Sequence, residues 1–342
     1  MLQKHLNNKI RIWRRMDKAG HVNKRLLVSF LLICATPVLL FGLFSISMLQ
    51  SSIHDEISDK ILILADSLEA EVYMYITHLE ARAMDFSSDG FIRDVTKKII
   101  QENSDTDVED LAYHLITNKK SLDKTISSIY ILDLNGRVIA STDRSEIGRM
   151  DSLEEYFLSG MSGVNTIEFI ASDDDNLHNY FIVSAPLTEK NTHEIIGVIA
   201  LSFDTEMLLD ILTGKFQLEK GAATSLLGRK ETLDIYLVNK NRNRITQSLN
   251  QNGVYFNTLP VEKCLRSNQE IVDVYKNYND EEVIGASMCF PDKKWVLITE
   301  ITTKEAYSQV RRVTFIFYAV TIAILIIIFI LSLISNKRLK DE

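Results

Sequence analysis

The sequence predicts an α+β protein: a long N-terminal helix that emerges from a membrane, followed by two successive antiparallel-sheet modules, with a transmembrane helix flanking them on each side. Three observations support this fold class. Residues 26–49 and 313–334 are uncharged apolar runs. Residues 50–88 form a charged amphipathic segment without Gly or Pro. Between this segment and the second run, short strand-like stretches recur in two series, at 127–203 and 233–301.

Each apolar run is long enough to cross a bilayer as a helix, which requires about 20 residues. We therefore expect transmembrane helices at 26–49 and 313–334. A cleaved signal peptide fits the first run poorly, because signals have a shorter apolar region and a small-residue cleavage site. The lipid bilayer is thus an expected partner of the chain.

The charge distribution predicts the orientation of the two spans. The whole chain carries −8, residues 1–25 carry +7 and residues 313–342 carry +1, so residues 26–312 carry −16. Because basic residues flank the cytoplasmic side of membrane helices, the basic segment 1–25 and the tail 335–342 are expected in the cytoplasm. The region between the spans would then lie outside the cell inner membrane, in the periplasm. A net charge of −16 argues against nucleic acid as a partner.

Residues 50–88 are expected to continue the first span as a stem helix. Apolar residues recur there with spacings of 4, 4 and 3, an 11-residue period that gives one stripe along a straight helix. The stripe comprises Ile53, Ile57, Ile61, Leu64, Leu68, Val72, Tyr75, Leu79, Ala83 and Phe86. Because the part at 53–68 has little of its own chain to cover it, we expect a homodimer.

The first sheet module is expected at 89–220. A break at 87–90 is followed by short helices at 91–100 and 108–119, the second capped by Asp107 and packing through Leu111, Leu115 and Ile116. Asn135–Gly136 predicts a two-residue hairpin turn between strands 127–134 and 137–142. Three further strands, at 164–170, 179–187 and 194–203, complete a five-stranded antiparallel sheet. We also expect a short helix within 144–163, an acidic loop at 172–176, and a helix at 205–214 capped by Asp204.

The second module is expected at 221–301 and repeats the pattern of the first. Its strands are predicted at 233–240, 244–248, 270–278, 282–290 and 294–301. A helix at 302–312 should then enter the second span without a break. Cys264 and Cys289 both lie in the external region, where a disulfide between them is expected, the alternative being two buried thiols.

Four stretches, in order, resemble the double Cache ligand-sensing domain of bacterial membrane receptors, a pair of PAS-like modules on a long helix. They are SSIYILDLNGRVIASTDRSEIGRM, DSLEEYF, SAPLTEKNTHEIIGVIALSFD and DVYKNYNDEEVIGASMCFPDKKWVLITEI. The resemblance implies that the membrane-distal module holds a small-molecule ligand and that the membrane-proximal module passes strain to the spans. Histidine kinases, chemoreceptors and diguanylate cyclases share this domain. Their output motifs are missing from the sequence, so we expect either a signalling partner in trans or a truncated receptor.

The resemblance also suggests where the ligand binds. In amino-acid-sensing members an arginine two residues before the first of two aromatics holds the ligand carboxylate; here Glu154 precedes Tyr156 and Phe157. The aspartate that holds the ligand amine corresponds to Ser202, with Asp204 two residues on. Both differences count against an α-amino acid, although Arg149 is a substitute cation. The candidate ligand-binding residues are Tyr130, Arg149, Glu154, Tyr156, Phe157, Tyr180, Ser202 and Asp204; core packing of the aromatics and a solvated Glu154 remain alternatives.

The sequence has no pattern typical of an enzyme, a cofactor site or a metal site. It lacks nucleophile-elbow, zinc-protease and nucleotide-binding motifs, and its seven histidines are scattered singly. The acidic run 173–175 lacks the ligand spacing of a calcium loop. The sequence therefore predicts an extracytoplasmic small-molecule sensor that transmits binding through its two spans. A ligand-independent periplasmic adaptor with the same fold is the alternative.

Overall fold

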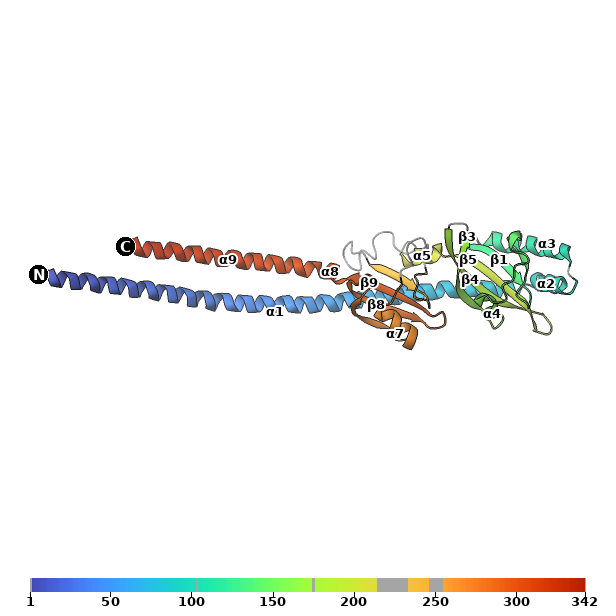
Figure 1. The fold of residues 1–342 in the computed structure, drawn as a ribbon, viewed down its shortest axis with the longest axis horizontal. Coiled ribbons are helices and arrows are strands. Elements are labelled where there is room, and N and C mark those ends of the chain that lie inside the picture. The colour runs from blue at the N-terminus through green and yellow to red at the C-terminus, as the bar shows by residue number, and fades with distance from the viewer. Residues whose placement is uncertain (1, 103, 174–175, 214–232, 246–254, 342) are drawn as a thin grey trace. The chain divides into compact units, whose positions relative to one another are not determined.

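The computed structural model describes residues 2–102, 104–173, 176–213, 233–245 and 255–341 (Figure 1). They fall into two compact units, Met1–Ile57 with Thr303–Glu342, and Ser58–Thr302. The second unit contains two antiparallel sheets, one of five strands and one of four. This mixed architecture, with its long N-terminal helix and two apolar helices, confirms the predicted fold class.

The first unit is helical. α1 (Leu2–Ser87) begins in it, and α8 (Thr303–Ala306) and α9 (Ser308–Asp341) complete it. Among the described residues, the stretches Thr36–Ser87 and Ser308–Ile327 are long and apolar enough to cross a membrane. α1 and α9 approach closely at Gly42, where a Cβ atom would lie 1.9 Å from Cζ of Phe317. The sequence prediction of an unbroken helix over 302–312 is wrong, because a turn at Tyr307 separates α8 from α9.

The second unit is built along the remaining part of α1, the stem (58–87). Most of the predicted apolar stripe is buried there: Ile61, Val72 and Ala83 have no exposed surface, whereas Leu64 is half-buried. The stripe is therefore confirmed, but the reason given for a homodimer is wrong. From Ile61 to Leu68 the stripe is covered by its own chain, since Leu68 is also only 6% exposed.

Two helices follow the stem. The Asp89 carboxylate caps α2 (Gly90–Glu102) by accepting hydrogen bonds from the amides of Phe91 (2.8 Å) and Ile92 (3.1 Å). α3 (Asp105–His114) is capped by Ser104, so the predicted cap at Asp107 is wrong.

α3 continues as a π-helical turn, η1 (Leu115–Lys119), and a 3₁₀ turn, η2 (Lys120–Leu122). The π-turn widens the helix and changes which side chains face the core. Leu111 and Leu115 are fully buried as predicted, whereas Ile116 is 42% exposed, so the predicted packing of Ile116 is wrong.

The five-stranded sheet has the order β2-β1-β5-β4-β3, and all of its neighbours are antiparallel. Its elements are β1 (Ile126–Leu132), β2 (Val138–Ser141), η3 (Arg144–Glu146), α4 (Glu155–Gly160), β3 (Asn165–Asp173), β4 (Asn176–Thr188), β5 (Ile195–Asp204) and α5 (Glu206–Leu212). The predicted acidic loop at 172–176 is wrong in extent, because Asp173 of β3 pairs with Asn176 of β4. The predicted cap at Asp204 is wrong by one residue, because the N-cap of α5 is Thr205, although Oδ1 of Asp204 accepts a hydrogen bond from the Glu206 amide at 2.9 Å.

The turn between β1 and β2 differs from the predicted two-residue turn. The amide of Asp133 donates to the carbonyl of Arg137 at 2.9 Å, and the Gly136 amide donates back to the Asp133 carbonyl at 3.0 Å. This encloses a three-residue loop, in which Gly136 alone has a positive φ, 77°. The Asp133 carboxylate accepts from the amides of Asn135 and Arg137, which stabilises the longer loop.

The four-stranded sheet has the order β6-β9-β8-β7. Its elements are β6 (Asp234–Val238), α7 (Leu259–Ser267), β7 (Ile271–Lys276), β8 (Glu282–Phe290) and β9 (Trp295–Thr302). Of the strand predicted at 244–248, Arg244 forms a bridge with Val238, and the part from 246 on lies outside the described residues.

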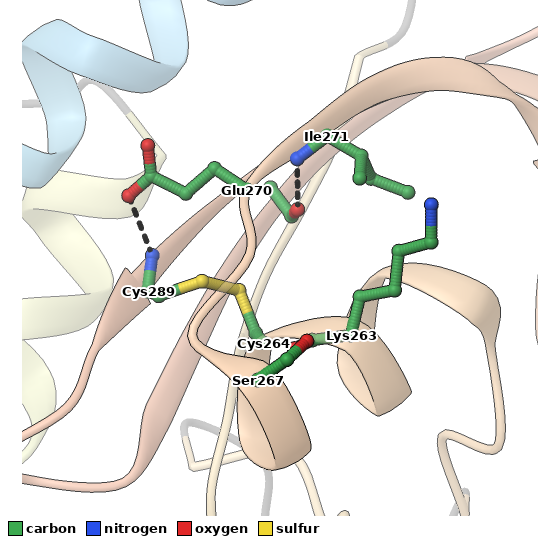
Figure 2. The surroundings of a disulfide bond; sticks show 7 residues. Lys263, Cys264, Ser267, Glu270, Ile271 and Cys289 are labelled. Carbon is green, nitrogen blue, oxygen red and sulfur yellow. Dashed lines mark hydrogen bonds between the residues drawn. A yellow bond between two sulfur atoms is a disulfide. The ribbon is translucent and has the colours of Figure 1, made fainter.

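A disulfide joins Cys264 of α7 to Cys289 of β8 (Figure 2). Both cysteines are buried, at 6% and 7% exposure. Beside them, the Glu270 carboxylate accepts a hydrogen bond from the Cys289 amide at 3.2 Å. The covalent link fixes α7 onto the same sheet that contains β9.

Candidate ligand-binding site

One face of the five-stranded sheet gathers most of the predicted ligand-binding residues. Residues paired across antiparallel strands share a face. Tyr130 of β1 pairs with Ala200 of β5, and two and four residues further along β5, Ser202 and Asp204 face the same way. Asp204 in turn pairs with Tyr180 of β4.

The short helix α4 covers part of this face. Tyr156 and Phe157 are 1% and 5% exposed, and they pack in one apolar cluster with Ile182 of β4 and Ala200 of β5. Tyr130 packs against the edge of the same cluster. Tyr156 and Phe157 are therefore part of the core, which agrees with the alternative of core packing. They also border the sheet face that carries the other candidate ligand-binding residues.

Arg149 belongs to a network of hydrogen bonds beside this cluster. Its Nε lies 2.8 Å from Oδ1 of Asp151, and its Nη2 lies 2.7 Å from Oδ2. The Tyr156 hydroxyl donates to the same carboxylate, and Nη1 of Arg149 pairs with Glu146. The guanidinium also stacks over the Tyr130 ring, with Cζ 5.1 Å from the centroid.

Burial and the hydrogen bonds within this network set the protonation states of Tyr156 and Arg149. Burial raises the pKa of Tyr156, and its hydrogen bond to the Asp151 carboxylate raises it further. Burial lowers the pKa of Arg149, but the bonds to Asp151 and Tyr156 outweigh it, so the pKa is raised above the ordinary arginine value. The cation is thus matched by two carboxylates within the network, and the network has no net positive charge to offer a ligand carboxylate.

The other two acidic residues of the motif point elsewhere. Glu154 is exposed at the N-cap position of α4, which agrees with the solvated alternative. Glu155 pairs with Lys240, which follows β6, at 2.6 Å. The structure therefore does not bring Glu154 to the face that carries Tyr130 and Ser202.

Three residues at this site were missed from the sequence: Asp151, Glu146 and Ser184. Asp151 is only 5% exposed. It follows Arg149 by two residues, and this spacing does not predict that the two side chains pair. Ser184 lies under α4, where Gly160 lets the helix approach: a Cβ there would be 2.8 Å from the serine Oγ. Among the described residues this buried Oγ has no hydrogen-bond partner.

Three contacts connect the two sheets within the second unit. The rings of Phe181 (β4) and Trp295 (β9) lie 5.5 Å apart. On the stem, Glu80 accepts a hydrogen bond from Thr166 of β3 at 2.9 Å and also pairs with Lys293, which precedes β9. The Glu155–Lys240 pair is the third contact. The five-stranded sheet is therefore joined to the sheet that contains β9 through the face that bears Phe181 and Thr166 and through α4 on the other face.

Two successive antiparallel sheets on one helix, the first with a covered aromatic face, define a tandem sensor domain. The chain belongs to the Cache domain family, whose double-module form matches residues 48–310. No curated protein matches the sequence.

Solved structures of the same fold come from bacterial receptors. The sensor domain of the V. cholerae histidine kinase DctB is 14% identical with a TM-score of 0.52, over 74% of this chain and 98% of that one. The ligand-binding domain of the Campylobacter jejuni chemoreceptor Tlp3 in complex with 4-methylisoleucine is 12% identical with a TM-score of 0.51, over 75% and 94%. The periplasmic sensory domain of the C. jejuni chemoreceptor Tlp1 is 11% identical with a TM-score of 0.50, over 75% and 98%. At these identities the likeness concerns the fold.

Proposed function

We propose that this protein is a membrane-anchored receptor input module that binds a small molecule outside the cytoplasm. The membrane-distal module, 89–220, would bind the ligand, and the membrane-proximal module, 221–301, would transmit the change through α8 to α9, which contains the second span. The observation that carries the proposal is the face shared by Tyr130, Tyr180, Ser202 and Asp204 in a chain of a ligand-sensing family. Two spans in the inner membrane with both termini cytoplasmic complete the arrangement, and the protein has no catalytic role.

The ligand class follows from the state of Arg149. Its guanidinium is bound to Asp151 and Glu146, so recruiting it to a ligand would leave buried carboxylates unpaired. With Asp204 at the open end of the same face, the ligand is a neutral or cationic molecule, such as an amine, and not one anchored by an α-carboxylate.

The ligand class is tested by thermal-shift measurements on the full chain in lipid nanodiscs. The probes are pairs that differ by one carboxylate, such as agmatine and arginine, or cadaverine and lysine. We expect the amine of a pair to stabilise the protein and its amino acid to do so less. D204N should weaken the amine shift, whereas D273N, at an exposed carboxylate of β7, should not. Stronger stabilisation by the amino acids would refute the ligand class.

Transmission would use the contacts between the sheets. A ligand that moves β4 moves Phe181, whose ring lies against Trp295 at the start of β9, and β9 leads directly into α8. The coupling is the difference in ligand affinity between two arrangements of this packing. A signalling partner in trans, such as a histidine kinase or cyclase, or an output domain would then respond to the spans.

We retain the homodimer on a different face of the stem. Residues spaced alternately by 4 and 3 form a charge-free seam, all of them exposed: Ile63, Ser67, Ala70, Met74, Thr77, Ala81 and Met84. A period of 3.5 residues suits a parallel helix pair between two copies of the chain. Asp66 and Glu71 flank the seam and would face like charges in such a pair, so salt should strengthen the dimer.

The dimer is tested by cysteine crosslinking in membranes, in a background where Cys34 is replaced by Ser. M74C should form a disulfide-linked dimer. Y113C, at a 70% exposed position on α3, is the control and should not. Equal crosslinking of both variants, or none at Met74, would remove the seam as an interface.

The alternative function is a ligand-independent adaptor with a Cache fold, which docks another periplasmic protein. It is favoured by the apolar side chains exposed near α4, including Leu153 at 90% and Leu158 at 54%. A broad metabolite screen without any thermal shift, together with intact binding of a partner by an L153D-sensitive surface, would select the adaptor.

A further inference from the structure

A buried carboxyl group lies in the second sheet, away from the ligand-binding face. Glu300 is the sixth residue of β9 and is only 2% exposed. It pairs with Asp234 of β6 on one side and Gly285 of β8 on the other, so it lies in the middle of the sheet. Three residues later the chain enters α8.

The surroundings of Glu300 compensate only part of a negative charge. Its Oε2 accepts a hydrogen bond from the Tyr275 hydroxyl at 2.7 Å, and the side chain of Asn277 also donates to it. Its Oε1 has no well-formed hydrogen bond among the described residues. Among the residues that the structure describes, no Lys, Arg or His forms an ion pair with Glu300. An ionised carboxylate without a cation is costly at such a site.

Gly285 makes the arrangement possible. A Cβ atom at this position would lie 2.5 Å from the Tyr275 hydroxyl and 3.0 Å from Cβ of Glu300. Any side chain there would push the phenol away from the carboxyl group. The sheet therefore keeps a space in which the two polar groups meet inside an otherwise apolar cluster that includes Tyr236 and Ile298.

The carboxyl groups that face Glu300 oppose its ionisation. Asp234 and Glu281 both add negative charge, and together with burial, the largest cause, they raise the pKa of Glu300 to about 7, against the opposing bonds from Tyr275 and Asn277. Arg244 stacks on Tyr236, its Cζ 4.9 Å from the ring centroid. The titratable and charged groups around the site are Asp234, Tyr236, Arg244, Asp273, Tyr275 and Glu281, contributed by β6, the segment after it, β7 and the turn before β8; Asp273 lies across Gly285 from Glu300.

We propose that the second module is a sensor in its own right, with the proton as its ligand and Glu300 as the binding group. With the proton bound, the neutral carboxyl group fits its buried position. When the proton leaves, the uncompensated charge favours an arrangement in which the end of β9 is more hydrated. Because β9 carries Trp295 at its start and leads into α8 at its end, protonation then alters the same strand that would carry the signal of the first module.

The experiment uses the fluorescence of Trp295 in the full chain. The protein has two tryptophans, so W13F in lipid nanodiscs leaves Trp295 as the single reporter, packed on Phe181. We expect the emission of W13F to change with a midpoint near neutral pH in a titration from about pH 5 to about 9. E300Q, which imitates the neutral form, should abolish this change. D110N, at an exposed carboxylate of α3 in the first module, is the control and should keep it.

A second variant and a second measurement guard against loss of folding. Y275F removes a donor that favours the charged form, so the midpoint should move upward by about one pH unit. Infrared difference spectra of W13F should contain the band of a protonated carboxyl group that disappears over the same pH range, and E300Q should lack it. A flat titration of W13F, or an unchanged transition or band in E300Q, would overturn the proposal, whatever the ligand of the first module is.

Discussion

Replacing Glu300 by Gln should remove the loss of stability with rising pH that Glu300 gives to the second sheet. Burial raises the pKa of the Glu300 carboxyl group from 4.5 in the unfolded chain to about 7 in the folded protein. Between these values the folded state holds a proton that the unfolded state has released, so the free energy of unfolding falls as pH rises. A difference of roughly 2.5 pKa units at 1.36 kcal/mol each makes the total loss about 3 kcal/mol, complete above neutral pH.

The prediction is measured by denaturant unfolding of the full chain, followed at Trp295 in the W13F background at several pH values. The parent protein should lose stability between about pH 4.5 and about 7.5, and E300Q should be nearly level over the same range. Above neutral pH E300Q should be the more stable of the two. If the two proteins follow parallel curves, or if the parent does not lose stability over this pH range, Glu300 does not hold a proton in the folded state.

Three further predictions concern the remaining parts of the second unit. R149M leaves the Asp151 carboxylate buried without its cation and should cost about 1–3 kcal/mol in denaturant unfolding, whereas its effect on amine affinity should be small; a large loss of affinity would make Arg149 a ligand contact. C264S opens a loop with a sequence separation of 25 and should cost about 3 kcal/mol under oxidising conditions, a difference that should vanish in excess reductant. S104A removes the cap of α3 and should lower stability by about 1 kcal/mol, while a matched change at the wrongly predicted cap, D107A, should cost less.

The elements of the fold could be predicted where one periodic signal decided the outcome. The stripe on the stem repeats every 11 residues. Ile61, Val72 and Ala83, which follow one another at this spacing, are fully buried. The strands of both sheets alternate or are apolar throughout, and most begin and end within a few residues of the expected positions. These features depend on sequence spacing alone, which is why no tertiary information was required.

The errors arose where a local signal competed with another local group. Asn135–Gly136 is a strong signal for a two-residue turn, but the Asp133 carboxylate accepts two backbone amides and favours a longer loop in which Gly136 alone has a positive φ. Ser104 precedes Asp107 and occupies the cap position first. The homodimer argument failed for a different reason: a stripe shows that a face is buried, but it does not show whether a partner or the chain itself buries it.

The location of the candidate site could be predicted more readily than the interactions of its residues. The resemblance pointed to Tyr130, Tyr156 and Ser202, and the register of β1 and β5 brings the first and last of these to one face. The pairing of Arg149 with Asp151 was not readable, because two residues two apart on an irregular segment can diverge or close equally well. Our proposal for the ligand class rests on this pairing, since the pairing determines whether a cation is free to hold a carboxylate.

Glu300 was beyond prediction for a physical reason that also explains its interest. In the sequence it is one acidic residue in the strand KWVLITEI, next to the exit helix, where a solvated carboxylate would be the ordinary expectation. Its burial depends on the pairing of β9 with β6 and β8 on its two sides. It also depends on Gly285, which has no side chain and leaves room for the phenol of Tyr275. Since a fully apolar residue at this position would pack without any such requirement, the presence of a carboxyl group here is consistent with a role in which its charge changes. Under our two proposals β9 would receive two inputs, because Trp295 packs on Phe181 of the five-stranded sheet at one end of the strand and Glu300 lies near the other.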